Sequence, residues 1–161
     1  MCGILGCLHK EDYDLNLQTF KQITQSLINR GPDDEGYFEF YIQPNILKFG
    51  HKRLSIIELT NKARQPMESF SERFVIIFNG EIYNHLDLRK EPCFANYKWK
   101  GTSDTETLIS LFQYYNIEDI LNKLEGMFAF CVFDNHQKKI ILARDRSGEK
   151  PLYLSSNNYF F

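Results

Sequence analysis

The chain begins Met1-Cys2-Gly3-Ile4, and these four residues govern how the rest of the sequence is interpreted. Cysteine is small, so an initiator-methionine aminopeptidase is expected to remove Met1 and leave Cys2 with a thiol and a free α-amine. The thiolate is the nucleophile, and an unperturbed thiol, with a pKa of about 8.5, needs a base at neutral pH. The α-amine, with a pKa of about 7.7–8.0, can be that base. On these residues alone, a small buried side chain at the start of a strand is the commoner alternative.

The composition is that of one folded domain. The chain has 161 residues, of which 43% are hydrophobic, which is enough for a substantial core. A net charge of −2 with scattered basic residues argues against nucleic acid as a partner. Cys2, Cys7, Cys93 and Cys131 lack Cys-x-x-Cys spacing, so we expect neither a disulfide scaffold nor a metal site. No segment predicts a membrane span or a secretory signal, and we expect a cytoplasmic protein.

Hydrophobic periodicity predicts a mixture of strands and helices. Strands are expected at 3–8, 36–42, 46–50, 73–78, 127–133 and 139–143, with β-like composition at 53–57. A helix of about four turns is expected from Leu17 to the stop signal Arg30-Gly31-Pro32. A capping box, Ser103-x-x-Glu106, predicts the start of a second helix, and a short third helix is expected at 117–124.

Two of these strands, 73–78 and 127–133, are apolar at nearly every position, so both of their faces must be covered. Gln43-Pro44-Asn45 predicts a hairpin, and Asn79-Gly80 predicts a type I′ turn after strand 73–78. The expected fold is therefore α+β, with two antiparallel sheets packed together and helices outside them. Tyr159-Phe160-Phe161 ends the chain inside an expected strand, which indicates a fragment of a longer polypeptide.

Seven short motifs together resemble one protein family. They are Met1-Cys2-Gly3-Ile4, Arg30-Gly31-Pro32-Asp33, Gly50-His51-Lys52-Arg53-Leu54-Ser55-Ile56, Phe78-Asn79-Gly80-Glu81-Ile82-Tyr83-Asn84, Thr102-Ser103-Asp104-Thr105-Glu106, Glu125-Gly126-Met127-Phe128-Ala129-Phe130 and Ala143-Arg144-Asp145-Arg146 through Tyr153. Over residues 1–161 the chain resembles the N-terminal glutaminase domain of glutamine-hydrolysing asparagine synthetase, a class II glutamine amidotransferase. The resemblance implies the N-terminal-nucleophile hydrolase fold, a four-layer αββα sandwich of two antiparallel sheets flanked by helices.

The resemblance also implies a reaction. Cys2 would attack the side-chain amide of glutamine to form a thioester, and its α-amine would pass a proton to the departing ammonia. Asn79, through its side-chain amide, and Gly80, through its backbone N–H, match the oxyanion hole of the family. Losing one such donor typically costs about 2.7–4 kcal/mol of transition-state stabilisation.

Free glutamine carries an α-carboxylate and an α-ammonium group, and each needs a partner. Arg53 suits the carboxylate because its planar guanidinium can form two parallel hydrogen bonds. Asp104 suits the ammonium, with Glu81 nearby, and the resemblance gives these residues the same roles. Taken singly, Arg53 would be a solvated cation at a strand end and Asp104 an acid in the first turn of a helix. The rest of the pocket is expected to be lined by backbone groups of Leu54, Ser55, Ile56 and Ile57.

Several other motif residues are expected to be structural. His51 is one of them, because the free amine makes a histidine base unnecessary. Arg30 and Asp33 are expected to order a loop near the mouth of the pocket. A charged network is expected from Arg144, Asp145, Arg146 and Lys150. Departures from the family pattern, outside the proposed chemistry, occur at Ser147 and Ala63-Arg64.

The synthetase domain that follows in this family is absent, since the chain contains no Ser-Gly-Gly-x-Asp-Ser pyrophosphate loop. No cofactor or metal is therefore expected within residues 1–161, and ATP and Mg²⁺ belong to the missing domain. The expected partners are L-glutamine and that domain, and a homodimer of the full-length protein stays open. Three alternatives also stay open: an amidotransferase for another acceptor such as a surface-polysaccharide sugar, a non-catalytic domain with the same fold, and a hydrolase of another amide. Arg53 and Asp104 argue against the last of these.

Overall fold

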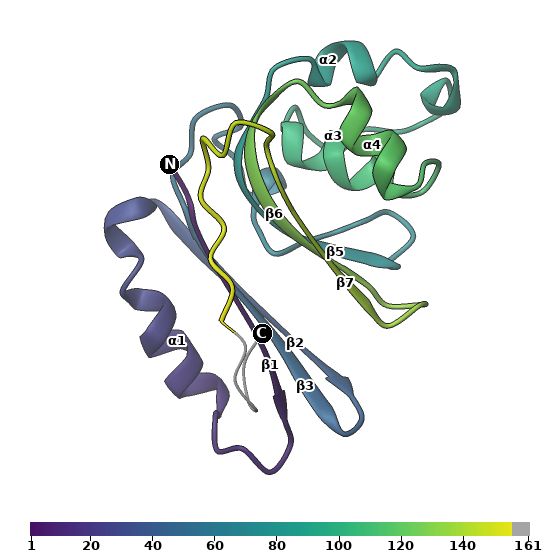
Figure 1. Ribbon diagram of the computed structural model, residues 1–161. Coiled ribbons are helices and arrows are strands. Elements are labelled where there is room, and N and C mark those ends of the chain that lie inside the picture. Colours follow the sequence, from purple (N-terminus) through teal and green to yellow (C-terminus); the bar gives the residue numbers. More distant parts are fainter. Residues whose placement is uncertain (156–161) are drawn as a thin grey trace.

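The computed structural model describes residues 1–155 and contains two antiparallel sheets (Figure 1). The first sheet has the strand order β1-β3-β2, and the second has the order β4-β5-β6-β7. The strands are β1 (Gly3–Lys10), β2 (Asp34–Ile42), β3 (Asn45–Arg53), β4 (Met67–Glu68), β5 (Phe74–Ile82), β6 (Gly126–Asp134) and β7 (Lys139–Arg144). The two-residue connection between β2 and β3 confirms the predicted hairpin.

The helices lie outside the two sheets. In Figure 1, α1 packs along the first sheet, while α2, α3 and α4 gather on the far side of the second. Their bounds are α1 (Leu17–Gln25), α2 (His85–Leu88), α3 (Asp104–Leu111) and α4 (Ile117–Lys123), with 3-10 turns at Ile28–Arg30, Asn61–Ala63 and Pro92–Phe94. The α+β class is thereby confirmed. Among residues 1–155 no helix has the length and apolar character needed to cross a bilayer.

An apolar layer fills the space between the sheets. It consists of Leu47, Phe49, Val75, Ile77, Cys131 and Phe133. The alternate residues of β5, Phe74, Ile76 and Phe78, point the other way and pack with α3 in a second cluster. Strand β5 is therefore covered on both faces, as its continuous apolar sequence predicts.

On the inner face of each sheet, the side chains change from apolar in this layer to polar at one end of the strands. On β3, the inward positions of Leu47 and Phe49 continue to His51 and Arg53. On β5, the same alternation leads from Ile77 to Asn79. Because one strand of each sheet contributes polar groups at this end, the fold brings them together there.

The predicted turn at Asn79-Gly80 is wrong. Strand β5 continues through both residues, which pair with Ala129 and Phe128 of β6. A Cβ atom on Gly80 would lie 2.2 Å from the carbonyl oxygen of Met127, so this position needs glycine because the neighbouring strand passes close by. Pairing with a distant strand has overridden the local turn preference of the Asn-Gly pair.

Two other boundaries also differ from the prediction. Helix α1 has nine residues, about two and a half turns, and the hydroxyl of Ser26 donates to the carbonyl oxygen of Ile23 at its end. Strand β3 ends at Arg53, because the backbone N–H of Leu54 donates to Cys2 Sγ and that of Ser55 donates to a side-chain carboxylate. The strand expected at 159–161 lies outside the described residues.

Candidate active site

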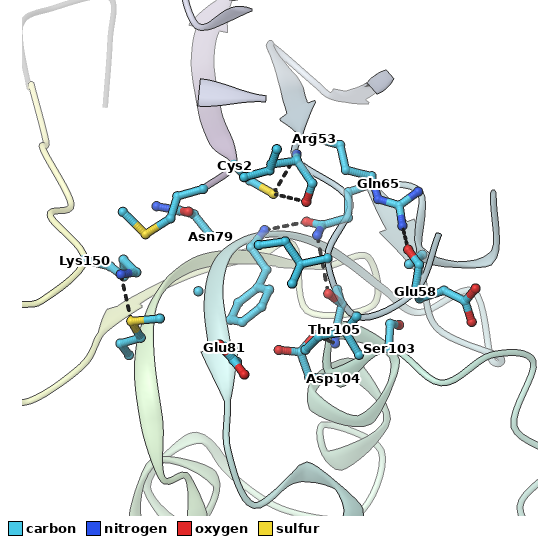
Figure 2. Close-up of a pocket in the computed structure, with 18 residues that line it drawn as sticks. Cys2, Arg53, Glu58, Gln65, Asn79, Glu81, Ser103, Asp104, Thr105 and Lys150 are labelled. Atoms are coloured by element: carbon cyan, nitrogen blue, oxygen red, sulfur yellow. Dashed lines mark hydrogen bonds between the residues drawn. The ribbon is translucent and has the colours of Figure 1, made fainter. Parts of the chain in front are cut away.

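A pocket of about 90 Å³ lies at the polar end of the two sheets (Figure 2). The predicted site residues that line it are Cys2, Arg53, Leu54, Ile56, Ile57, Asn79, Gly80, Glu81 and Asp104. Ser55 is not one of the lining residues, because its N–H is turned to the carboxylate of Asp33, 2.7 Å away. The structure therefore joins four segments that are distant in sequence, and Met1 still forms part of the wall.

Cys2 lies directly before β1 and faces the chain beyond the end of β3. The backbone N–H of Leu54 donates to its Sγ at 3.4 Å, and the thiol in turn lies 3.7 Å from the carbonyl oxygen of Leu54. Burial raises the pKa of the Cys2 thiol, while the hydrogen bond from Leu54 and the charge of Arg53 act in the opposite direction. The thiol is therefore protonated at neutral pH and needs a base to become a nucleophile.

Asn79 and Gly80 line the pocket from β5. Asn79 is 5% exposed, and its Oδ1 atom is buried without a hydrogen-bond partner among residues 1–155. A buried polar atom without a partner is destabilising, typically by about 1–3 kcal/mol. Such an atom in a pocket is typical of a group whose partner arrives with a ligand or during the reaction.

Arg53 is buried rather than solvated. Its Nη1 donates to the carbonyl oxygen of Thr60 at 3.0 Å, and its Nη2 donates to that of Glu58. These two bonds fix the plane of the guanidinium, which has five N–H groups in all. The remaining donors are available to a carboxylate that enters the pocket.

Asp104 is held between α3 and β5. Its Oδ2 accepts the backbone N–H of Ile82 at 3.0 Å, and its Oδ1 accepts that of Thr105 at 2.8 Å. Burial raises the pKa of Asp104 to about 6, and the nearby charge of Glu81 adds to this effect. The helix begins as predicted, because Ser103 Oγ accepts the N–H of Glu106 at 3.2 Å. Asp104 is therefore a buried, first-turn acid that faces the pocket.

His51 does not line the pocket. It is fully buried between the sheets, and its Nε2 lies 3.3 Å from the carbonyl oxygen of Phe78, so it links β3 to β5. Burial lowers the pKa of His51 to about 4, so the ring is neutral at neutral pH. This placement fits a structural role.

The prediction of a network of charged side chains after β7 is wrong. The carboxylate of Asp145 accepts backbone N–H groups from Phe128, Glu149 and Lys150 instead of pairing with the neighbouring cations. Of the four charged residues, Lys150 is one that lines the pocket, which sequence reasoning did not anticipate. The turn after β7 is thus fastened to β6 beside the pocket.

Sequence reasoning also missed Gln65. Its Oε1 accepts the backbone N–H of Phe78 at 2.6 Å, and its Nε2 donates to Thr105 Oγ1 at 3.4 Å, so it joins β5 to α3 at the wall of the pocket. Ala63 also lines the pocket. From the sequence, it is a departure from the family pattern and is expected to lie outside the proposed chemistry. No periodicity or motif in the sequence marks either residue, because both lie in an irregular segment. The other lining residues that were not predicted are Glu58, Phe78, Ser103, Thr105 and Met127.

The two-sheet α+β fold thus places Cys2 in a pocket together with Arg53 and Asp104. The family model described as glutamine amidotransferase domain matches residues 1–161, and the chain belongs to this family. It is 38% identical over 161 residues to asparagine synthetase [glutamine-hydrolyzing] 1 of Bacillus subtilis, covering 98% of this chain and 24% of that protein. It is 35% identical over 162 residues to asparagine synthetase [glutamine-hydrolyzing] 1 of Saccharomyces cerevisiae, covering 98% and 26%.

The relatives are much longer than the matched region. The chain spans about a quarter to a third of the length of the curated relatives from B. subtilis, yeast and Methanocaldococcus jannaschii. The similarity therefore concerns the glutamine amidotransferase part of each relative.

Proposed function

We propose that this chain hydrolyses L-glutamine to glutamate and ammonia with Cys2 as the nucleophile. The observation that carries the proposal is that Cys2, Asn79, Arg53 and Asp104 line one pocket, although they come from four separate segments. Hydrolysis of this substrate requires a nucleophile, an oxyanion donor, and one group for each charged end of the amino acid. Membership of the glutamine amidotransferase domain family supports the same substrate.

The steps follow from the chemistry of the residues. After removal of Met1, the α-amine of Cys2 takes the thiol proton, and Sγ attacks the side-chain amide carbon of glutamine. The negative oxygen receives hydrogen bonds from the Asn79 amide and the Gly80 N–H. Collapse of the tetrahedral intermediate breaks the C–N bond of the amide. The α-ammonium of Cys2 gives its proton to the departing nitrogen, which leaves as ammonia. Water, deprotonated by the amine, then cleaves the thioester and restores the thiol.

The substrate is held at its other end. Arg53 binds the α-carboxylate with the guanidinium donors that Thr60 and Glu58 leave free. Asp104 binds the α-ammonium, and Glu81 adds negative charge on the same side. Leu54, Ile56 and Ile57 form the wall between these groups. Both charged ends must be met, so the pocket selects a free amino acid over a simple acyl amide.

At the level of the fold, we assign residues 1–161 to one class II amidotransferase domain with the N-terminal-nucleophile hydrolase architecture, a four-layer αββα sandwich. The outer placement of α1 and α3 around two facing sheets supports this assignment. The relatives' names lead us to propose that the ammonia passes to a synthetase domain beyond this chain, which uses ATP to make asparagine. Amidation of another acceptor is the alternative for the full-length protein.

The decisive assay is glutamate release from glutamine by protein whose N-terminus is shown by mass spectrometry to be Cys2. Cys2→Ala should abolish release. Cys7→Ala is the matched control, because Cys7 lies on β1, the strand that follows Cys2, but is buried in the cluster with Leu15 and Phe20 and does not line the pocket. Equal activity of the Cys2→Ala variant and the parent would refute the nucleophile assignment. Retention of Met1 in the native protein would favour a non-catalytic domain, since the amine would then be an amide.

A further inference from the structure

Lys150 is a buried cation with an unusual partner. It is 4% exposed, and its Nζ lies 2.9 Å from the thioether Sδ of Met127. Among residues 1–155 it forms no ion pair within 4.0 Å. A thioether is a weak acceptor, and a buried ammonium without a strong acceptor is costly. The ammonium therefore has unused donor capacity at the wall of the pocket.

The position of Lys150 is set by the fold. Asp145, which is 5% exposed, accepts the backbone N–H of Phe128 at 3.1 Å and that of Lys150 at 3.0 Å through the same oxygen. Its other oxygen accepts the N–H of Glu149 at 2.8 Å. This carboxylate thereby fastens the turn after β7 to β6, and the side chain of Lys150 is directed back over Met127.

Asn79 offers the complementary group. Its Oδ1 is buried and lacks a hydrogen-bond partner within the described chain. In the β5–β6 register, Asn79 is opposite Ala129 and Glu81 is opposite Met127, so Met127 is the diagonal neighbour of Asn79 on one face. Diagonal neighbours lie about 7–8 Å apart or closer, within reach of a long side chain that rests on one of them.

Figure 2 shows Asn79 and Lys150 on the side of the pocket away from Arg53 and Gln65. Glu81, the nearest acid in the register, points toward Asp104 instead, and its charge helps to raise the pKa of that carboxyl. An acceptor without a donor and a donor without a good acceptor thus line the same wall.

We propose that, in the processed protein, Lys150 Nζ donates a hydrogen bond to Asn79 Oδ1 and orients the side-chain amide. An amide can donate to an oxyanion only through Nδ2, and its two ends are otherwise nearly interchangeable in shape. Engaging Oδ1 turns Nδ2 toward the reacting carbonyl, and the cation behind the amide strengthens its dipole. Lys150 is then a positioning residue. Its effect on rate rests on the function proposed above, whereas the contact itself does not.

Steady-state kinetics of variants that lack Met1 test the effect of Lys150 on the rate of glutamine hydrolysis. Lys150→Met keeps the unbranched apolar stem of the side chain but removes the donor, and it should lower kcat about tenfold or more while KM for glutamine stays within about twofold. Lys150→Arg can donate to the same oxygen and should retain activity within about threefold of the parent. An unchanged kcat in Lys150→Met would overturn the proposal.

Repeating the Lys150→Met substitution in an Asn79→Ala variant distinguishes an effect on the orientation of Asn79 from a general loss of stability. In Asn79→Ala, where the amide is gone, Lys150→Met should change kcat less than about twofold, because residues that act as a unit are not additive. The same loss in both backgrounds would contradict action through Asn79. Lys48→Met is the matched control, since Lys48 is equally buried but pairs with Glu39 away from this pocket. It should lower stability and leave kcat of the folded protein unchanged.

A crystal structure of the processed protein decides the contact without any assay. We expect Lys150 Nζ within about 3.2 Å of Asn79 Oδ1. A lysine that still rests on Met127 Sδ while Oδ1 stays unpaired would overturn the inference. If the parent protein released no glutamate, the proposed function would fail, and this distance would still give an independent answer for Lys150.

Discussion

Along the inner face of β5, apolar side chains at one end give way to polar ones at the other. Val75 and Ile77 are 2% and 1% exposed and pack into the apolar layer between the sheets. Asn79 and Glu81, the next residues on the same face, line the pocket. The backbone is the same regular strand throughout, paired with β6 from end to end. What changes is the side chains that the strand carries, from apolar Val75 and Ile77 to polar Asn79 and Glu81.

The two ends differ in how well their groups are satisfied. The apolar end is a closed layer in which burial stabilises the fold. The pocket end contains a buried amide oxygen without a partner and a carboxyl whose pKa is raised to about 6 by burial. Both features destabilise the folded state, which indicates that this end is arranged for a ligand and not for stability. Mutations at the two ends should therefore have opposite signatures.

The largest contrast is expected from Cys2→Ala at the pocket end. Glutamate release should fall at least about 10⁴-fold, since no other group can form the thioester. The free energy of unfolding should change by less than about 1 kcal/mol, because Cys2 lies outside the apolar clusters. Initial rates and urea titration of the same preparation measure both quantities. If Cys2→Ala lost activity because it was largely unfolded, the expected difference between the two ends of β5 would be refuted.

Asn79→Ala should also reduce activity with little effect on stability. We expect kcat to fall about 10²–10³-fold, or about 2.7–4 kcal/mol of transition-state stabilisation, with KM nearly unchanged. In the chain that retains Met1, Asn79 Oδ1 has no partner, so its removal there should not lower the free energy of unfolding. Steady-state kinetics and thermal unfolding provide the comparison. An increase in KM at constant kcat would show that Asn79 binds the substrate instead.

The pH dependence of KM tests Asp104. Its pKa is raised from 3.8 to about 6, mainly by burial, so below pH 6 the carboxyl becomes neutral and loses its attraction for an α-ammonium. KM for glutamine should rise about tenfold per pH unit below 6. Because the folded state binds this proton more tightly than the unfolded chain, its contribution to stability decreases as pH rises from 3.8 to about 6. A KM that stays flat between pH 5 and 7 would exclude this role.

The smallest effect is expected at the apolar end. Ile77→Val removes one methylene from the layer between the sheets and should lower the free energy of unfolding by about 0.5–1.5 kcal/mol. The kcat of the folded protein should stay within about twofold, although Ile77 is only two residues from Asn79. Denaturant midpoints and kinetics at low temperature are the measurements. A large drop in kcat would mean that the apolar layer and the pocket are mechanically coupled.

Local sequence determined much of this protein. The alternation of apolar residues predicts the strands, and the capping box at Ser103 predicts where α3 begins, because both depend on neighbouring residues. The other six motifs, and not Met1-Cys2 alone, favour Cys2 as a nucleophile with its own base, and this stays a prediction. Within the pocket, Arg53, Asn79 and Asp104 are residues that the motifs singled out in advance.

Only the tertiary structure decided the rest. Asn79-Gly80 has the sequence of a turn but lies within β5, because pairing with β6 and the close approach of Met127 outweigh a local preference. Gln65 and Lys150 enter the pocket through contacts with residues far away in the chain, and no local pattern encodes such contacts. Sequence periodicity specifies which side of a strand a residue faces, whereas its neighbours across the sheets depend on packing of the whole chain.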